Sequence, residues 1–157
     1  MSTINRDMVE LAGNVLIVDD DRATRDFLTT ILSREGFHAV AAEDGLEALH
    51  VLRTVRRRAP DVACLVLLDL AMPRLGGAEF RRAQLGDPIV ANVPVAVMSG
   101  ASDLEQRART MGAVATVAKP IDDDALMSVV RRYCSLEAMD LGPAADGLPN
   151  GGRENGA

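Results

Sequence analysis

Residues 15–21 read VLIVDDD, a short apolar run that ends abruptly in three carboxylates. A near-continuous apolar run of this length is typical of a parallel strand that is buried on both faces of its sheet. Similar runs that also end in a polar residue lie at 62–68, 93–98 and 114–118. Because helix-like segments separate these runs, the chain predicts an α/β fold built from repeated strand–helix units.

We predict five strands and five helices with a doubly wound arrangement, in which helices cover both faces of a parallel sheet. The predicted strands are Asn14–Asp19, Phe37–Ala42, Val62–Asp69, Val93–Ser99 and Val114–Ala118. The predicted helices are Arg22–Glu35, Gly45–Arg58, about Ala78–Leu85, Ser102–Met111, and a last helix capped by Asp122 and ending at about Ser135. The 3.6-residue period of the first helix places Phe27, Leu28, Ile31 and Leu32 on one face.

The predicted strands and helices are flanked by a segment at each end of the chain, and the composition changes after the last helix. Residues 1–13 form an N-terminal extension, and residues 137–157 are rich in Gly, Ala and Pro and lack periodicity. Residues 137–157 bury too little apolar surface to fold, so we expect either a flexible tail or the stub of a linker. The domain is expected to cover residues 14–136.

The bulk composition restricts the class of protein. A formal net charge of −6 disfavours nucleic acid or an anionic membrane as the main partner. No apolar run approaches the roughly 18 residues that a membrane span needs, and the N-terminus lacks the apolar stretch of a signal peptide. We therefore expect a cytoplasmic protein, with Cys64 and Cys134, the only cysteines, as reduced and packed thiols.

Polar side chains stand at the ends of four predicted strands: Asp19, Asp20, Asp69, Ser99 and Lys119. In an open α/β sheet, the carboxyl ends of neighbouring parallel strands converge on one crevice. Packed carboxylates repel one another and are commonly neutralised by a cation. Oxygen ligands without His or Cys favour Mg²⁺ or Mn²⁺. The pattern therefore predicts a divalent cation beside a phosphorylated side chain.

Each residue also has a simpler interpretation. The acidic triplet fits helix capping as well as it fits metal binding, and Asp21 is the simplest cap. Asp69 can be a loop carboxylate in solvent, Ser99 can belong to a turn, and Lys119 can be a solvated strand end. Convergence of these residues at neighbouring strand ends is what favours a functional site.

Four motifs resemble the response-regulator receivers of two-component signalling, the CheY-like family. They are VLIVDDD at 15–21, LVLLDLAMP at 65–73, VPVAVMSG at 93–100 and AKPID at 118–122. The resemblance extends in order from about Asn14 to Cys134. It implies a flavodoxin-like fold, a five-stranded parallel sheet of order 2-1-3-4-5 with five helices.

The resemblance implies a role for each site residue. Asp69 would be the phosphoacceptor, Ser99 would sense the phosphoryl group, and Lys119 would pair with it. Asp20 would bind Mg²⁺ directly, and Asp19 would act largely through water. Asp69 and the backbone carbonyl of Ala71 would complete the metal site, which Mn²⁺ could also occupy.

The resemblance further implies partners rather than turnover of a substrate. A sensor histidine kinase or a histidine phosphotransfer protein would donate the phosphoryl group, and a downstream protein would bind residues 102–135. The receiver is expected to stand alone, as a monomer or weak dimer, and to catalyse only its own phosphorylation and dephosphorylation.

The alternatives are a phosphorelay carrier, a degenerate receiver that works without phosphate, and a Mg²⁺-dependent phosphohydrolase. The phosphohydrolase is disfavoured because the chain has no Gly-rich phosphate loop and no D-x-D pattern at Asp69.

Thr116 departs from the family pattern, which often has an aromatic residue three positions before the Lys. Without that ring, an aromatic rotamer switch cannot operate. We therefore expect activation to pass through a backbone or loop shift near Ser99–Ser102.

Overall fold

The computed structural model describes residues 14–58, 63–72 and 76–134. Five parallel strands form one sheet in the order β2-β1-β3-β4-β5. The strands are β1 (Asn14–Val18), β2 (His38–Ala42), β3 (Ala63–Asp69), β4 (Val95–Ser99) and β5 (Ala115–Ala118). The helices are α2 (Arg22–Arg34), α3 (Gly45–Arg58), α4 (Gly77–Leu85), α5 (Leu104–Met111) and α6 (Asp123–Tyr133).

The predicted fold class, strand order and alternation of strands with five helices are confirmed. The N-terminal extension at 1–13 and the tail at 137–157 lie outside the described residues. None of the described helices has the length and apolarity needed to cross a membrane.

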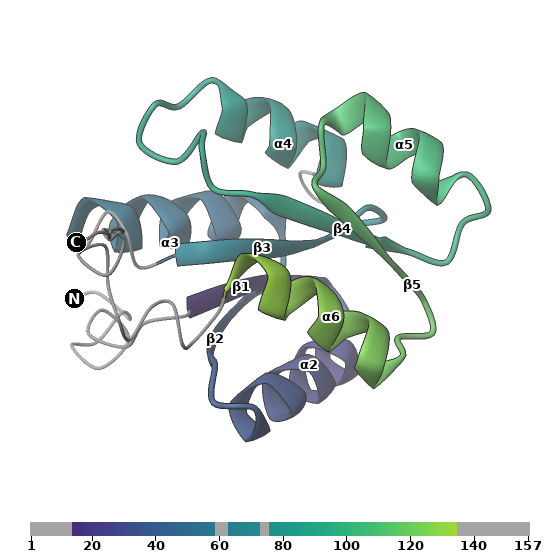
Figure 1. Ribbon diagram of the computed structural model, residues 1–157. Coiled ribbons are helices and arrows are strands. Elements are labelled where there is room, and N and C mark those ends of the chain that lie inside the picture. The colour runs from purple at the N-terminus through teal and green to yellow at the C-terminus, as the bar shows by residue number, and fades with distance from the viewer. Residues whose placement is uncertain (1–13, 59–62, 73–75, 135–157) are drawn as a thin grey trace, which may run out of the picture.

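Helices cover both faces of the sheet, with α2 and α6 on one face and α3, α4 and α5 on the other (Figure 1). Successive side chains of β1 enter opposite cores. Val15 and Ile17 pack with α2 and α6, whereas Leu16 and Val18 pack with the other three helices. All four are at most 4% exposed, which explains why this strand is an unbroken apolar run.

Local side-chain chemistry sets several helix ends. Asp21, Asp44 and Asp122 each accept the backbone N–H of the residue three positions later, at 2.9 Å. Gly112 ends α5 with a φ of 69°, which favours glycine. The predicted caps of α2 and α6 are confirmed, and each helix follows its strand, β1 or β5, after a short connection.

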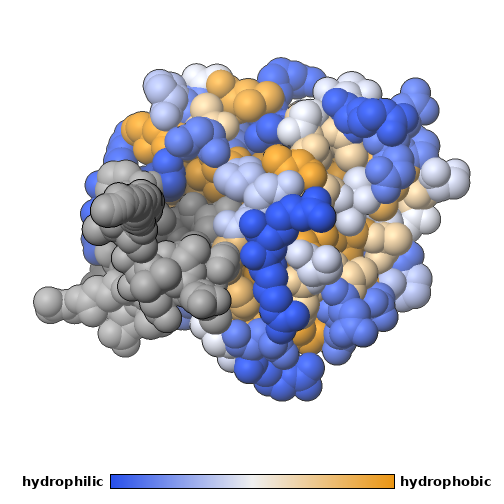
Figure 2. All heavy atoms as spheres, viewed as in Figure 1, coloured by the Kyte–Doolittle hydropathy of each residue, from blue (hydrophilic) through white to orange (hydrophobic). Residues whose placement is uncertain are grey.

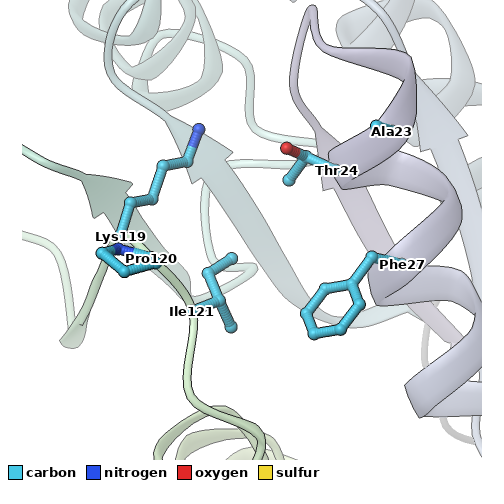
Figure 3. Close-up of a pocket in the computed structure, with 6 residues that line it drawn as sticks. All are labelled: Ala23, Thr24, Phe27, Lys119, Pro120 and Ile121. Atoms are coloured by element: carbon cyan, nitrogen blue, oxygen red, sulfur yellow. The ribbon is translucent and has the colours of Figure 1, made fainter.

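Phe27, which the helical period places on the same face as Leu28, Ile31 and Leu32, is 42% exposed. Leu28, Ile31 and Leu32 fill the space between α2 and the sheet. Phe27 is on the flank of this stripe and faces the segment that follows β5 (Figure 3). Helical periodicity gives the approximate direction of a side chain but does not fix the width of the buried stripe.

Cys134 follows α6 and is fully buried beside α2 and β1 residues. It is disulfide-bonded in the structure, so the prediction of a reduced thiol is wrong for this residue. That prediction followed from the expected cell compartment, which carries no information about which groups the fold brings together. The side chain of Cys64 is outside the described part of the chain.

Gly77, the first residue of α4, packs against the end of β3. A Cβ at this position would lie 2.9 Å from the carbonyl oxygen of Asp69 and 3.0 Å from Cα of Leu70. Because both are backbone atoms, we expect Gly77→Ala to lower the free energy of unfolding by about 1–3 kcal/mol. Urea denaturation measures this change.

Gly86→Ala is the matched control for Gly77→Ala. A Cβ at Gly86 would lie no closer than 3.7 Å to its neighbours. We expect this variant to stay within about 0.5 kcal/mol of the parent protein. Equal urea midpoints for the two variants would show that the backbone at the end of β3 moves away from the added Cβ without loss of stability.

Candidate functional site

Three carboxylates converge at the carboxyl edge of the sheet. Oxygen atoms of Asp19, Asp20 and Asp69 all lie within 4.8 Å of one another. β1 and β3 are hydrogen-bonded neighbours, so their ends bring Asp19 and Asp69 together. Asp19 is 0% and Asp69 4% exposed, whereas Asp20 faces solvent. The convergence expected from the strand ends is therefore present.

Lys119 joins this cluster from the end of β5. Its Nζ lies 2.8 Å from Oδ2 of Asp19 and 3.3 Å from Oδ1 of Asp69. Lys119 is the only lysine in a chain that otherwise uses arginine for its basic side chains. An ammonium is a compact point charge, whereas a guanidinium is a broad planar fork. The site thus has the cation that fits a narrow space between two buried carboxylates.

Ser99 lies at the same edge, one position beyond the residue of β4 that pairs with Asp69. It is 7% exposed, and its Oγ accepts the backbone N–H of Ala101 at 3.0 Å. Ala71 donates its N–H to Oδ1 of Asp69 at 3.3 Å. The structure therefore places every site residue selected from the sequence at one edge of the sheet.

Burial and the neighbouring Asp19 carboxylate raise the pKa of Asp69, and Lys119 opposes this rise. Ionisation of Asp69 therefore costs folding free energy, and stability falls as the pH rises through this raised pKa. Burial opposes the charge of Lys119, but its hydrogen bond to Asp19 and the nearby Asp69 charge raise the pKa of Lys119 overall. Lys119 is thus protonated at neutral pH, and its stabilising contribution is lost only at strongly alkaline pH.

The donor set fits a hard divalent cation. Three carboxylates face one ammonium, which leaves negative charge uncompensated once Asp69 is ionised. All the side-chain ligands are oxygens, which Mg²⁺ and Mn²⁺ prefer, and Asp20 is accessible from solvent.

Arg25 also contacts the site, although the sequence analysis did not select it. Its Nη1 donates to the backbone carbonyl oxygen of Asp19 at 2.7 Å. Arg25 lies four residues after Asp21, the cap of α2, and so faces back toward the strand end. That spacing is the only sequence signal that could have identified it.

An apolar hollow of about 270 Å³ opens beside Lys119. Its walls come from α2 and from the segment after β5, namely Ala23, Thr24, Phe27, Lys119, Pro120 and Ile121. Figure 3 shows the Phe27 ring and the Ile121 side chain facing one another across this space, with the Lys119 amine at one end. The edge of the sheet that carries the carboxylates is thus flanked by an apolar surface.

Comparison with known proteins assigns the family. The sequence profile of the response regulator receiver domain matches residues 15–131. The chain belongs to the response regulator receiver family. This receiver is 34% identical over 127 residues to Sporulation initiation phosphotransferase F of Bacillus subtilis (strain 168), which covers 79% of this chain and 95% of that protein.

A longer relative is Response regulator MprA of Mycobacterium sp. (strain KMS). The two are 33% identical over 138 residues, which cover 85% of this chain and 56% of MprA. The receiver therefore spans little more than half the length of that regulator.

Solved structures of receivers have the same fold. Chemotaxis protein CheY4 of Vibrio cholerae superposes with a TM-score of 0.66 at 25% identity, over 78% of this chain and 98% of CheY4. The receiver domain of a signal transduction histidine kinase from Syntrophus aciditrophicus has a TM-score of 0.68 at 27% identity, over 88% and 98% of the two chains.

Proposed function

We propose that this receiver takes a phosphoryl group from the phosphohistidine of a sensor histidine kinase or a histidine phosphotransfer protein onto Asp69. In its phosphorylated state it then signals by binding a partner protein. One observation carries the proposal: the buried Asp69 carboxylate lies 3.3 Å from the Lys119 ammonium and beside Asp19 and Asp20. Intact-mass spectrometry after incubation with acetyl phosphate and Mg²⁺ tests it.

In the proposed transfer, an Asp69 oxygen forms a bond to phosphorus as the phosphorus–nitrogen bond of the donor breaks. Lys119 already contacts Asp69, so its ammonium is placed to bind a phosphoryl oxygen. The Ser99 hydroxyl would donate a hydrogen bond to another phosphoryl oxygen. The carboxylates of Asp19, Asp20 and Asp69 and the carbonyl of Ala71 would hold Mg²⁺. When bound, Mg²⁺ supplies charge neutralisation for the transferred group.

The hollow beside Lys119 suits the donor protein. A phosphohistidine that reaches Asp69 must approach over this edge, and an apolar side chain near it could fill the space lined by Phe27 and Ile121. The 42% exposure of Phe27 in a free receiver then has a functional explanation. We infer that Phe27 contributes to donor binding and takes no part in the chemistry.

Phe27→Ser is expected to slow phosphoryl transfer from a histidine kinase about tenfold, as for loss of an aromatic interface residue. Phosphorylation by acetyl phosphate should stay unchanged, because this small donor needs no docking surface. Leu85→Ser is the control, since Leu85 is 52% exposed at the end of α4. Equal slowing with both donors would show that Phe27 acts on the reactive site itself.

A phosphorelay carrier is the second candidate function. The likeness to Sporulation initiation phosphotransferase F, a protein named for phosphotransfer, favours it. The test mixes the phosphorylated receiver with histidine phosphotransfer proteins and follows the phosphoryl group. Transfer to a histidine would support the carrier, whereas a lasting complex with an output protein would support the signalling role.

We propose that the output surface lies within residues 102–135, of which the structure describes α5, β5 and α6. Figure 2 shows that hydrophilic side chains cover much of the face in view, with smaller hydrophobic areas between them.

Thr116 of β5 donates its hydroxyl to Glu105 Oε2 of α5 at 2.6 Å. This bond stands where an aromatic side chain was expected from the family pattern, and it connects the strand to the first turn of the helix.

Phosphorylation is expected to shift the loop at 99–102, because movement of Ser99 Oγ toward a phosphoryl oxygen would pull on the Ala101 N–H that it accepts. The shift should extend through Glu105 to Thr116. Amide NMR spectra with and without beryllium fluoride, a phosphoryl mimic, should change most at these residues. An unchanged environment around Ser99 and Thr116 would rule out this route of activation.

A further inference from the structure

Asp20 differs from the other two carboxylates of the site. The Asp19 carboxylate accepts hydrogen bonds from Lys119 and from the Asp21 N–H, and the Asp69 carboxylate accepts from Ala71 and contacts Lys119. Within the described ranges, no donor contacts the carboxylate of Asp20, which faces solvent. Its direction therefore depends on the backbone on either side of it.

Two hydrogen bonds fix the peptide planes that flank Asp20. The N–H of Asp21 donates to Oδ1 of Asp19 at 2.9 Å and orients the plane that follows Asp20. Arg25 Nη1 donates to the carbonyl oxygen of Asp19 at 2.7 Å and orients the plane that precedes it. The Arg25 bond is short and involves an ionised donor, so it is the stronger kind of hydrogen bond.

The rest of this corner is anchored as well. The N–H of Asp19 donates to the Ala42 carbonyl at 3.1 Å, and Asp21 accepts from both the N–H and the hydroxyl of Thr24. Together with the Arg25 bond, these contacts hold the backbone of the turn. The Asp20 side chain makes none of these contacts and is exposed to solvent. Arg25 reaches the turn from the first turn of α2 and bonds to a backbone carbonyl, not to a carboxylate of the site.

We propose that Arg25 is a positioning residue for Asp20, because it fixes the Asp19–Asp20 peptide and so directs the Asp20 carboxylate toward the divalent cation. This inference rests on the function proposed above. Arg25 would act through the backbone and would be neither a metal ligand nor a nucleophile.

The positive charge of Arg25 and its positioning role would have opposite effects on Mg²⁺ affinity, so a binding measurement distinguishes them. A guanidinium near the site repels a cation, so removal of its charge alone would tighten Mg²⁺ binding. For a partly exposed, screened charge this effect is about fivefold or less. Loss of a group that orients a metal ligand typically weakens binding by about 10–100-fold. The positioning role therefore predicts weaker binding, and a pure charge effect predicts tighter binding.

The test compares Arg25→Met with Arg22→Met in the full chain. Methionine keeps an apolar stem but removes every donor and the charge. Arg22 lies in the same turn of α2, its side chain is 86% exposed, and its Nε lies 3.8 Å from Oδ2 of Asp26, which is outside the site. Isothermal calorimetry measures the Mg²⁺ dissociation constant of each protein without any phosphodonor.

We expect Arg25→Met to raise the Mg²⁺ dissociation constant about tenfold, and Arg22→Met to leave it unchanged or slightly lower. Arg25→Lys, which keeps the charge and one donor group, should fall between parent and Arg25→Met. At saturating Mg²⁺, the rate of phosphorylation by acetyl phosphate should return to the parent value in Arg25→Met. A merely structural role would lower the thermal midpoint without producing this recovery.

Mg²⁺ binding by Arg25→Met that is as tight as in the parent, or tighter, would overturn the proposal. If Arg25→Met does not fold, Arg25→Lys takes its place, and parent-like affinity in that variant overturns the proposal. A parent that binds Mg²⁺ and is phosphorylated while the variants are unchanged removes only the role of Arg25. A parent that does neither removes the proposed function and this inference together.

Discussion

Asp69→Asn is expected to abolish phosphorylation of this receiver. The amide nitrogen and oxygen of asparagine are far weaker nucleophiles than a carboxylate. Asp19 also contacts Lys119, but both of its carboxylate oxygens accept hydrogen bonds, from Lys119 and from the Asp21 N–H, whereas Lys119 and Ala71 contact only Oδ1 of Asp69. After incubation with acetyl phosphate and Mg²⁺, the parent should gain one phosphoryl group by intact-mass spectrometry. The variant, and the parent in the presence of a chelator, should gain none.

Unfolding cannot account for this expected loss. Burial and Asp19 raise the pKa of Asp69, so its ionised form costs folding free energy at neutral pH. Removal of the charge also removes a partner of Lys119, which retains its bond to Asp19. We therefore expect Asp69→Asn to be within about 1 kcal/mol of the parent in urea denaturation without Mg²⁺.

Asp103→Asn is the control for Asp69→Asn. Asp103 is an exposed residue that precedes α5 without making a side-chain capping bond. This variant should be phosphorylated like the parent. A folded, Mg²⁺-binding parent that takes no phosphoryl group from any donor would instead support a degenerate receiver that binds partners without phosphate.

Lys119→Met is expected to have the second largest effect, and it should affect both stability and chemistry. Asp19 is 0% exposed, and within the described residues Lys119 is the one cationic side chain that contacts its carboxylate. Removal of one member of a buried pair leaves an uncompensated charge, so we expect a loss of about 2–4 kcal/mol in the free energy of unfolding. Phosphorylation by acetyl phosphate should slow by at least about a hundredfold, since the group that binds the transferred oxygens is gone.

Added Mg²⁺ distinguishes the effect of Lys119→Met on stability from its effect on phosphorylation. A divalent cation would neutralise the same carboxylates, so added Mg²⁺ should stabilise this variant more than it stabilises the parent. Urea denaturation with and without Mg²⁺ measures the difference. Equal stabilisation of both proteins would mean that Mg²⁺ does not bind next to Asp19.

Lys119→Arg is the matched variant, because it keeps the charge and changes the shape. It should retain most of the stability that Lys119→Met loses. Its broad guanidinium should still fail to restore the normal response to phosphorylation, which the amide shifts at 99–105 would report. Parent-like behaviour of Lys119→Arg would show that only the charge matters at this position.

The sequence predicted much of the fold because short-range chemistry determines it. Unbroken apolar runs identified strands buried on both faces, and capping carboxylates such as Asp21 and Asp122 identified helix starts. The positions of Asp19, Asp69 and Lys119 at strand ends predicted their convergence, because parallel strands place their carboxyl ends at one edge. These features need only the order of residues along the chain and the geometry of a parallel sheet.

Contacts between separate elements were decided by the tertiary structure alone. The outward position of Phe27, the bond of Arg25 to the Asp19 carbonyl and the bond between Thr116 and Glu105 depend on how α2 and α5 lie against the sheet. Sequence periodicity says which face of an element is apolar, but not which atom of a distant element lies opposite each side chain. The sequence therefore determined which residues converge at the strand ends. Packing determined which side chains orient those residues and which line the hollow beside them.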